Sequence, residues 1–149
     1  MAVSPIPSGF HTLTPYLIVK DGAKLIEFLK AALGAEVKHL SKAPDGLVMH
    51  ATLRIGDSML MLSDAREEWP AQPTHLYLYV PNVDELYQRA IQAGAVSVNA
   101  PRDEFYGDRM AGIKDPSGNG WWIATHVEDV SEVEMSRRRE KLFGQNAKA

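Results

Sequence analysis

Two segments of the chain repeat the same pattern, and this internal repeat limits the fold more than any other feature of the sequence. Residues 16–21 (YLIVKD) and residues 77–82 (YLYVPN) each combine alternating apolar residues with a residue that can cap a helix. A helical stripe follows each segment, and Gly34-Ala35 and Gly94-Ala95 take the same place in the two copies. Each half therefore predicts a strand, a helix and then three strands.

The periodicity of apolar residues gives the expected elements of the two halves. In the first half we expect a helix capped by Asp21 and ended by Gly34, with strands at Leu13–Lys20, Glu36–Leu40, Leu47–Ile55 and Met59–Leu62. In the second half we expect a helix capped by Asn82 and ended by Gly94, with strands at His75–Val80, Val96–Asn99, Arg109–Ile113 and Gly120–Thr125. Ser131 and Glu134 have the spacing of a capping box, which predicts a short C-terminal helix over residues 131–143.

These elements predict an α+β fold in which paired βαβββ modules form a curved mixed sheet around a cavity. We expect one domain over residues 1–149, with module 1 at 12–63, a polar, proline-broken linker at 64–73 and module 2 at 74–126. The apolar strand faces, with Leu17 and Leu78, should pack under the helices. The opposite faces, with Tyr16 and Tyr77, should line the cavity.

Composition excludes several classes of function. The 149 residues contain no cysteine, so thiolate zinc, iron–sulfur clusters and cysteine nucleophiles are excluded. The net charge of −3 gives no reason to expect nucleic acid or an anionic membrane as a partner. No apolar run approaches the roughly 20 residues that span a bilayer, and the N-terminus does not resemble a secretion signal. We therefore expect a cytoplasmic protein.

Several motifs follow one another along the internal repeat. Asp115-Pro-Ser-Gly118 leads into Trp121-Trp122, and residues 50–56 (HATLRIG), 106–109 (YGDR) and 121–126 (WWIATH) surround it. Together they resemble the vicinal-oxygen-chelate superfamily of glyoxalases, bleomycin resistance proteins and dioxygenases, and in particular its PhnB-like branch. The resemblance covers roughly residues 13–130 and implies the fold more strongly than any activity.

In enzymes of that superfamily, His and Glu residues on the concave sheet hold a divalent metal that chelates two oxygens of a substrate. By this resemblance the ligand positions fall on Thr14, Thr52, His75 and Trp122. Only His75 is a metal ligand, so we expect no metal cofactor. His50 lies two residues before Thr52 and on the same strand face. Together with His75 it forms the one alternative pair of residues for weak metal binding.

The cavity-facing positions and the loop before residue 109 provide the candidate site. The residues expected to bind a ligand are Thr14, Tyr16, His50, Thr52, His75, Tyr77, Tyr106, Arg109 and Trp122. Tyr106 and Arg109 can bind an anionic or planar group, or Arg109 can instead pair with Asp108 or Asp115. His39 and His126 are expected at the surface.

These residues are compatible with three functions. The first is a metal-free protein that binds a small aromatic or amphipathic molecule, as a homodimer. The second is a lyase or isomerase with a rebuilt metal site, or with His75 or His50 as a general base. The third is a scaffold whose cavity is filled by Trp122 and the tyrosines.

Overall fold

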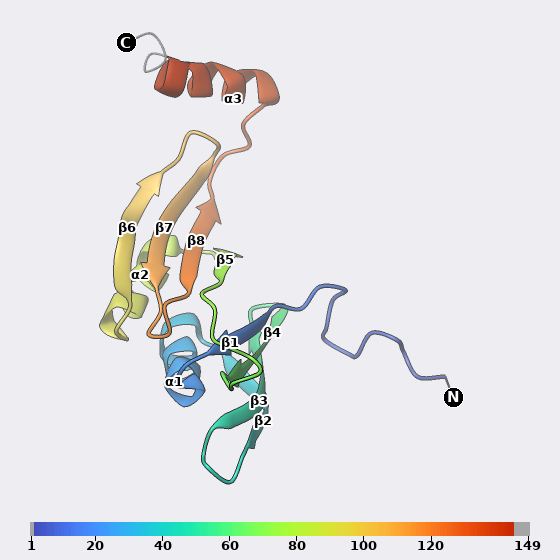
Figure 1. Ribbon diagram of the computed structural model, residues 1–149. Helices are drawn as coiled ribbons and strands as arrows, with labels where there is room; N and C mark the ends of the chain where they lie inside the picture. Colours follow the sequence, from blue (N-terminus) through green and yellow to red (C-terminus); the bar gives the residue numbers. More distant parts are fainter. Residues whose placement is uncertain (1, 145–149) are drawn as a thin grey trace.

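The protein consists of two four-stranded mixed sheets, each with one helix, in a computed structural model that describes residues 2–144 (Figure 1). Module 1 contains β1 (Tyr16–Val19), α1 (Gly22–Leu33), β2 (Glu36–Lys42), β3 (Val48–Ile55) and β4 (Ser58–Asp64). Module 2 contains β5 (His75–Tyr79), α2 (Val83–Gln92), β6 (Val96–Asp103), β7 (Asp108–Lys114) and β8 (Gly120–His126). The strand orders β1-β4-β3-β2 and β5-β8-β7-β6 are the same, which confirms the predicted α+β fold and its repeat.

Both module helices begin at the predicted caps. The Asp21 side chain accepts a hydrogen bond from the Lys24 backbone N–H, and Asn82 does the same for Glu85. Gly34 follows α1 in a left-handed conformation with φ of 66°, which a residue with a side chain adopts at a cost. Helix α1 buries one stripe completely, and its members are Leu25, Phe28, Leu29, Ala32 and Leu33.

Each sheet has a helix-covered face and an open face, and strand alternation decides which side chains lie on each. Leu17 and Val19 of β1 are buried under α1, whereas Tyr16, which precedes Leu17 on the strand, is 47% exposed. In module 2, Leu76, Leu78 and Val80 pack against the core. We call the side of each sheet that faces away from its helix the open face.

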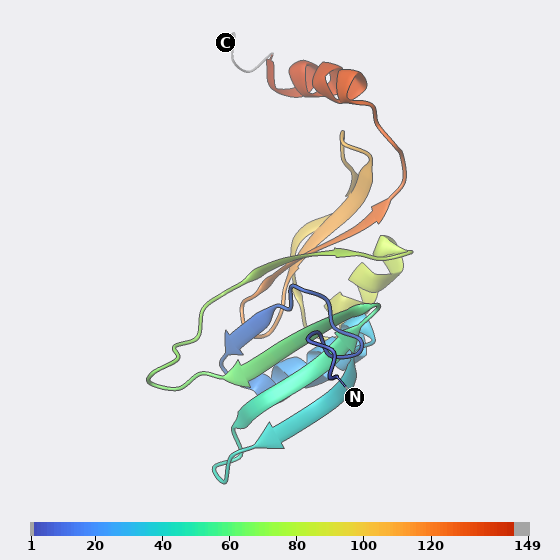
Figure 2. The ribbon, with the colours of Figure 1, turned by 90° about the vertical axis from the view of Figure 1, so that its right-hand side faces the viewer.

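The two sheets stay separate within one chain. Strands β1 and β5, which start the modules, are edge strands of their own sheets and do not pair with each other. The modules meet instead through α1 and α2, where Arg89 donates a hydrogen bond to the Ala31 carbonyl (Figures 1 and 2). The paired modules thus form two four-stranded sheets, one in each half of the chain.

Helix α3 (Glu132–Arg139) follows the last strand and continues as a π-helical turn over Glu140–Gly144. It lies beyond the β6–β7 hairpin, away from both sheets (Figures 1 and 2), and none of its residues is buried. Arg138 connects it to the hairpin by hydrogen bonds to the Phe105 carbonyl and to Glu128. The predicted C-terminal helix is confirmed.

Strand β6 extends four residues beyond its predicted end at Asn99. It continues through Pro101 to Asp103 with shifts of register after Ser97 and Asn99. Proline lacks a backbone N–H, and β6 tolerates it because it is an edge strand with irregular pairing. Over residues 2–144, no helix is both long and apolar enough to cross a membrane.

Candidate functional site

The open face of module 1 holds a short chain of polar contacts. The Tyr16 hydroxyl lies 3.3 Å from Nδ1 of His50, and Nε2 of His50 lies 3.0 Å from the Thr52 hydroxyl. The His39 ring, which was expected at the surface, lies 5.9 Å from the His50 ring. Both nitrogens of His50 are therefore engaged within the sheet.

An apolar hollow of about 460 Å³ lies beside these residues. It is lined by Tyr16, Ile18, Met49, Ser63, Asp64, Arg66 and Trp69. Met49 reaches it because the pairing of β3 with β2 is irregular there, with Ser41 opposite His50 and Lys42 opposite Val48. Trp69 reaches it from the loop between the modules, through the Arg66–Trp69 bridge. Both side chains are more than half exposed.

On the open face of module 2, an imidazole and an indole are stacked. The His75 and Trp122 rings lie 6.3 Å apart with their planes only 15° from parallel. Glycines make room for both rings. A Cβ on Gly112 would stand 2.6 Å from Cζ3 of Trp122, and one on Gly120 would stand 2.5 Å from Nδ1 of His75. Gly112 and Gly120 thus leave room for both rings to lie flat against the sheet.

Farther along the same face, two tyrosines and a histidine converge on the buried carboxylate of Asp108. The Tyr77 and Tyr79 hydroxyls donate to its Oδ2 over 3.0 and 2.9 Å. Nδ1 of His126 lies 2.8 Å from Oδ1, and Nε2 of His126 lies 2.8 Å from Asp129. We call Tyr77, Tyr79, Asp108 and His126 the Asp108 cluster.

Hydrogen bonds set the charge state of this cluster. Burial alone raises the pKa of Asp108, but the bonds from His126, Tyr79 and Tyr77 outweigh it and hold the pKa below the ordinary value. The same contacts, first with Asp108 and then with Asp129, raise the pKa of His126. Burial, the nearby Tyr106 phenol and Asp108 raise the pKa of Tyr77. The carboxylate stays ionised and the phenols stay protonated.

Arg109 lies on the other side of the sheet from the Asp108 cluster. Its guanidinium forms a two-pronged ion pair with Asp84 of α2, at 2.8 and 2.9 Å, and also contacts Asp103. Neither of the partners expected from the sequence, Asp108 and Asp115, is the one it has. Arg109 therefore connects β7 to the start of α2, whereas Tyr106 lies near Tyr77 on the open face.

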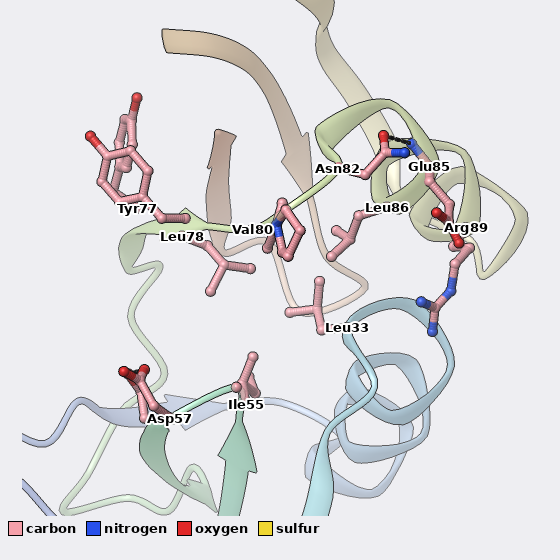
Figure 3. Close-up of a pocket in the computed structure, with 14 residues that line it drawn as sticks. Leu33, Ile55, Asp57, Tyr77, Leu78, Val80, Asn82, Glu85, Leu86 and Arg89 are labelled. Carbon is pink, nitrogen blue, oxygen red and sulfur yellow. Dashed lines mark hydrogen bonds between the residues drawn. The ribbon is translucent and has the colours of Figure 1, made fainter. Parts of the chain in front are cut away.

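A second hollow lies between the modules rather than on an open face. It measures about 550 Å³, and Leu33, Leu78 and Leu86 point into it (Figure 3). Asn82, Glu85 and Arg89 lie along α2 beside it, and Asp57 lies across from them. Tyr77 and Tyr79 of β5 also border this groove, although the Tyr77 ring points away from its centre.

The comparisons with known proteins agree with this architecture. Residues 9–123 match the family model described as the Glyoxalase/Bleomycin resistance protein/Dioxygenase superfamily. The chain belongs to this superfamily. The uncharacterized protein Mb0911c of Mycobacterium bovis is 34% identical over an alignment of 146 positions that covers 91% of this chain and 93% of that protein.

Solved structures of other proteins show the same fold. TioX from Micromonospora sp. ML1 has a TM-score of 0.69 and 23% identity, over 78% of this chain and 99% of that one. TnmS3, an antibiotic binding protein from Streptomyces sp. CB03234, has a TM-score of 0.63 and 22% identity, over 85% and 98%.

The metal of the superfamily's enzymes does not fit the residues at the corresponding positions here. Thr52 is buried against His50, Trp122 offers no ligand atom, and the His75 ring is stacked on Trp122. Within residues 2–144, no three His, Asp or Glu side chains are placed to hold a metal ion. Thr14, the remaining position, precedes β1 by two residues and is partly exposed.

The sequence-based site therefore falls into two groups in this member of the superfamily. Tyr16, His50 and Thr52 meet on module 1, while His75, Tyr77, Tyr106 and Trp122 lie on module 2. Met49, Trp69, Asp108 and His126 also lie on these faces, although the sequence did not predict them as ligand-binding residues. Strand alternation from Trp122 would have placed His126 on the same face. No sequence signal marks Met49, which depends on the irregular pairing.

Proposed function

We propose that this protein binds a small aromatic or amphipathic molecule on the open faces of its sheets, without a metal ion. The observation that carries the proposal is the row of aromatic rings left uncovered there. Tyr16, Tyr77 and Tyr79 are 47%, 46% and 63% exposed, and glycines flatten the sheet beneath His75 and Trp122. Aromatic rings that lie flat against the sheet are suited to stacking on a planar ligand.

At His50, the contacts of the ring support a binding role over that of a general base. A general base needs a free nitrogen aimed at the proton that it removes, and both ring nitrogens of His50 are engaged, with Tyr16 and Thr52. The face of the His75 ring is turned to Trp122, which suits this ring to stacking. TnmS3, described as an antibiotic binding protein, has the same fold. We also propose that this chain belongs to the PhnB-like branch of the superfamily.

We further propose that the protein is a homodimer in which the open face of module 1 meets the open face of module 2 of a second copy. Among the described residues, no ring contact or side-chain hydrogen bond joins Tyr16, His50 or Thr52 to His75 or Trp122. Strands β1 and β5 are both edge strands of their sheets, and on the outer side of β1 the Gln72 backbone N–H donates to the Ile18 carbonyl. A second copy can supply the missing wall of each cavity.

The binding proposal is tested by screening small aromatic compounds with thermal shift and then measuring affinity by calorimetry. We expect a hit to bind the wild type and to bind Trp122→Leu more weakly. One lost aromatic contact corresponds to about 2- to 13-fold in Kd. Phe143→Leu is the matched control, since Phe143 is an exposed ring on the C-terminal turn. If no compound binds, or if both variants bind equally well, the proposal fails.

Mixing two variants tests the shared cavity. Tyr16→Ala damages module 1 and Trp122→Ala damages module 2, so each homodimer lacks one wall in both cavities. In a mixed dimer one cavity has both walls intact, and we expect binding to return after mixing. Light scattering that shows a monomer, or a mixture that stays inactive, contradicts the homodimer.

A further inference from the structure

The Asp108 cluster has a property that the binding of a neutral aromatic molecule does not use. Its two phenol rings come from β5, and its carboxylate comes from β7 on the far side of β8. Ala124 of β8 lies between them, opposite Tyr79 on one side and Met110 on the other, and it is fully buried. A small residue at this position lets the tyrosines reach across the middle strand.

The two rings form an open corner above the carboxylate. Their centroids lie 5.2 Å apart and their planes are inclined by 50°. Asp108 is 3% exposed, while Tyr77 and Tyr79 are about half exposed or more. The ring faces are thus accessible to a ligand, whereas the charge beneath them is shielded from water.

Hydrogen bonding makes these rings attractive to positive charge. Each phenol donates its proton to an anionic oxygen, which pushes electron density into the ring. The electron-rich face of an aromatic ring attracts a cation, and desolvation strengthens that attraction. Two tyrosines that share one carboxylate therefore present a stronger site for a cation than isolated tyrosines do.

No lysine or arginine neutralises the carboxylate within residues 2–144. Arg109, its neighbour in sequence, is drawn to the opposite side of the sheet by Asp84 and Asp103. The one ion-pair partner of Asp108 in the described part of the chain is His126, and His126 is shared with Asp129. The carboxylates of Asp108 and Asp129 face one imidazole, so the cluster together with Asp129 carries net negative charge.

We propose that Tyr77, Tyr79 and Asp108 form a subsite for an organic cation, the protonated or quaternary amine group of an amphipathic ligand. This proposal rests on the proposed function, because the cation belongs to the molecule whose planar part stacks near His75 and Trp122. The aromatic corner contacts the cationic group and the carboxylate beneath supplies the counter-charge. The subsite thereby selects cationic ligands over neutral ones of the same shape.

The experiment compares choline with its neutral isostere 3,3-dimethyl-1-butanol, using amide chemical shifts of the full chain during NMR titration. We expect choline to bind about tenfold more tightly than the alcohol, as for a partly desolvated cation on aromatic rings. The shifts should centre on β5 and β7. Equal affinity for the two probes, or no binding of choline, overturns the proposal.

Variants test which residues cause the preference for choline over the neutral alcohol. Tyr79→Leu and Asp108→Asn should each reduce the preference for choline to nearly nothing, whereas Tyr87→Leu should keep it. Tyr87 is the matched control because it lies on α2, where its hydroxyl donates to Ser97. A preference that survives in Tyr79→Leu overturns the proposal even if Asp108→Asn does not fold. Neutral aromatic hits that still bind would show that the proposed function stands without this subsite.

Discussion

The indole of Trp122 lies directly against Gly112 of the neighbouring strand, and the two residues are paired in the β7–β8 register. A Cβ at Gly112 would meet Cζ3 and Cε3 of the indole at 2.6 and 2.9 Å. Since real Cβ atoms do not approach that closely, the ring lies flat only because residue 112 is glycine.

Gly112→Ala should therefore tilt the indole away from the sheet and disturb its stacking with His75. We expect a loss of about 1–3 kcal/mol in unfolding free energy, the usual cost of overpacking. Ligand affinity should fall along with it. Urea unfolding and calorimetry measure the two effects. A variant with unchanged stability and binding would show that the indole does not need a glycine at position 112.

Asp64 holds the start of α1 to the start of β3. Its two carboxylate oxygens accept hydrogen bonds from the backbone N–H groups of Gly22 and Val48, both at 2.7 Å, and the residue is 6% exposed. Asp64→Asn replaces one acceptor by an NH₂ group that faces another donor. We expect a loss of about 1–3 kcal/mol in the free energy of unfolding. An unchanged urea midpoint would contradict this anchoring role.

Arg109 should matter for the packing of α2 on the sheet and not for ligand binding. Arg109→Gln removes the ion pair with Asp84, and we expect a small fall in melting temperature, because the pair is partly exposed to water. The affinity for an aromatic hit should stay the same. A large loss of affinity with an unchanged melting temperature would show that Arg109 belongs to the binding site.

The contact of His126 with Asp108 should make stability depend on pH in a defined direction. The folded state raises the pKa of His126 above its ordinary value, so it binds this proton more tightly than the unfolded chain does. The resulting stabilisation is complete below the unfolded pKa of about 6.5 and is lost as pH rises through the folded pKa.

Urea unfolding of wild type and His126→Gln over a series of pH values above about 5 measures this dependence, since the Asp108 pKa lies below its usual range and the carboxylate stays ionised there. The wild type should have its largest advantage at the acidic end of the series, and the advantage should shrink toward alkaline pH. An advantage that grows with pH would contradict the ion pair.

The sequence predicts the fold well because local signals and the repeat agree. Asp21, Asn82 and Ser131 cap the three helices as their spacing indicates, and the apolar stripes face the sheets. Asp115 begins the Asp115-Pro-Ser-Gly118 motif, and its carboxylate accepts the backbone N–H of Ser117 and also the Trp121 indole N–H. Such features depend on neighbours in sequence and are readable from it.

The candidate site depends on contacts between strands and is predicted less well. Asp108 and Arg109 are adjacent and oppositely charged, which favours a local pair, but strand alternation sends them to opposite faces. His126 comes at the end of β8, and its partner Asp108 is recognised only once the β7–β8 register is known. Trp69 reaches the module 1 hollow through a loop that carries no periodic pattern.

The three indole N–H signals of the chain provide the most direct test that the open faces bind the ligand. In a ¹⁵N NMR titration with an aromatic hit, we expect the Trp122 and Trp69 signals to shift, because these side chains lie on the open faces. The Trp121 signal should stay in place, because its N–H is buried and donates to Asp115 over 2.8 Å. A hit that leaves the Trp122 signal unmoved while it shifts other parts of the chain would contradict binding on the open faces.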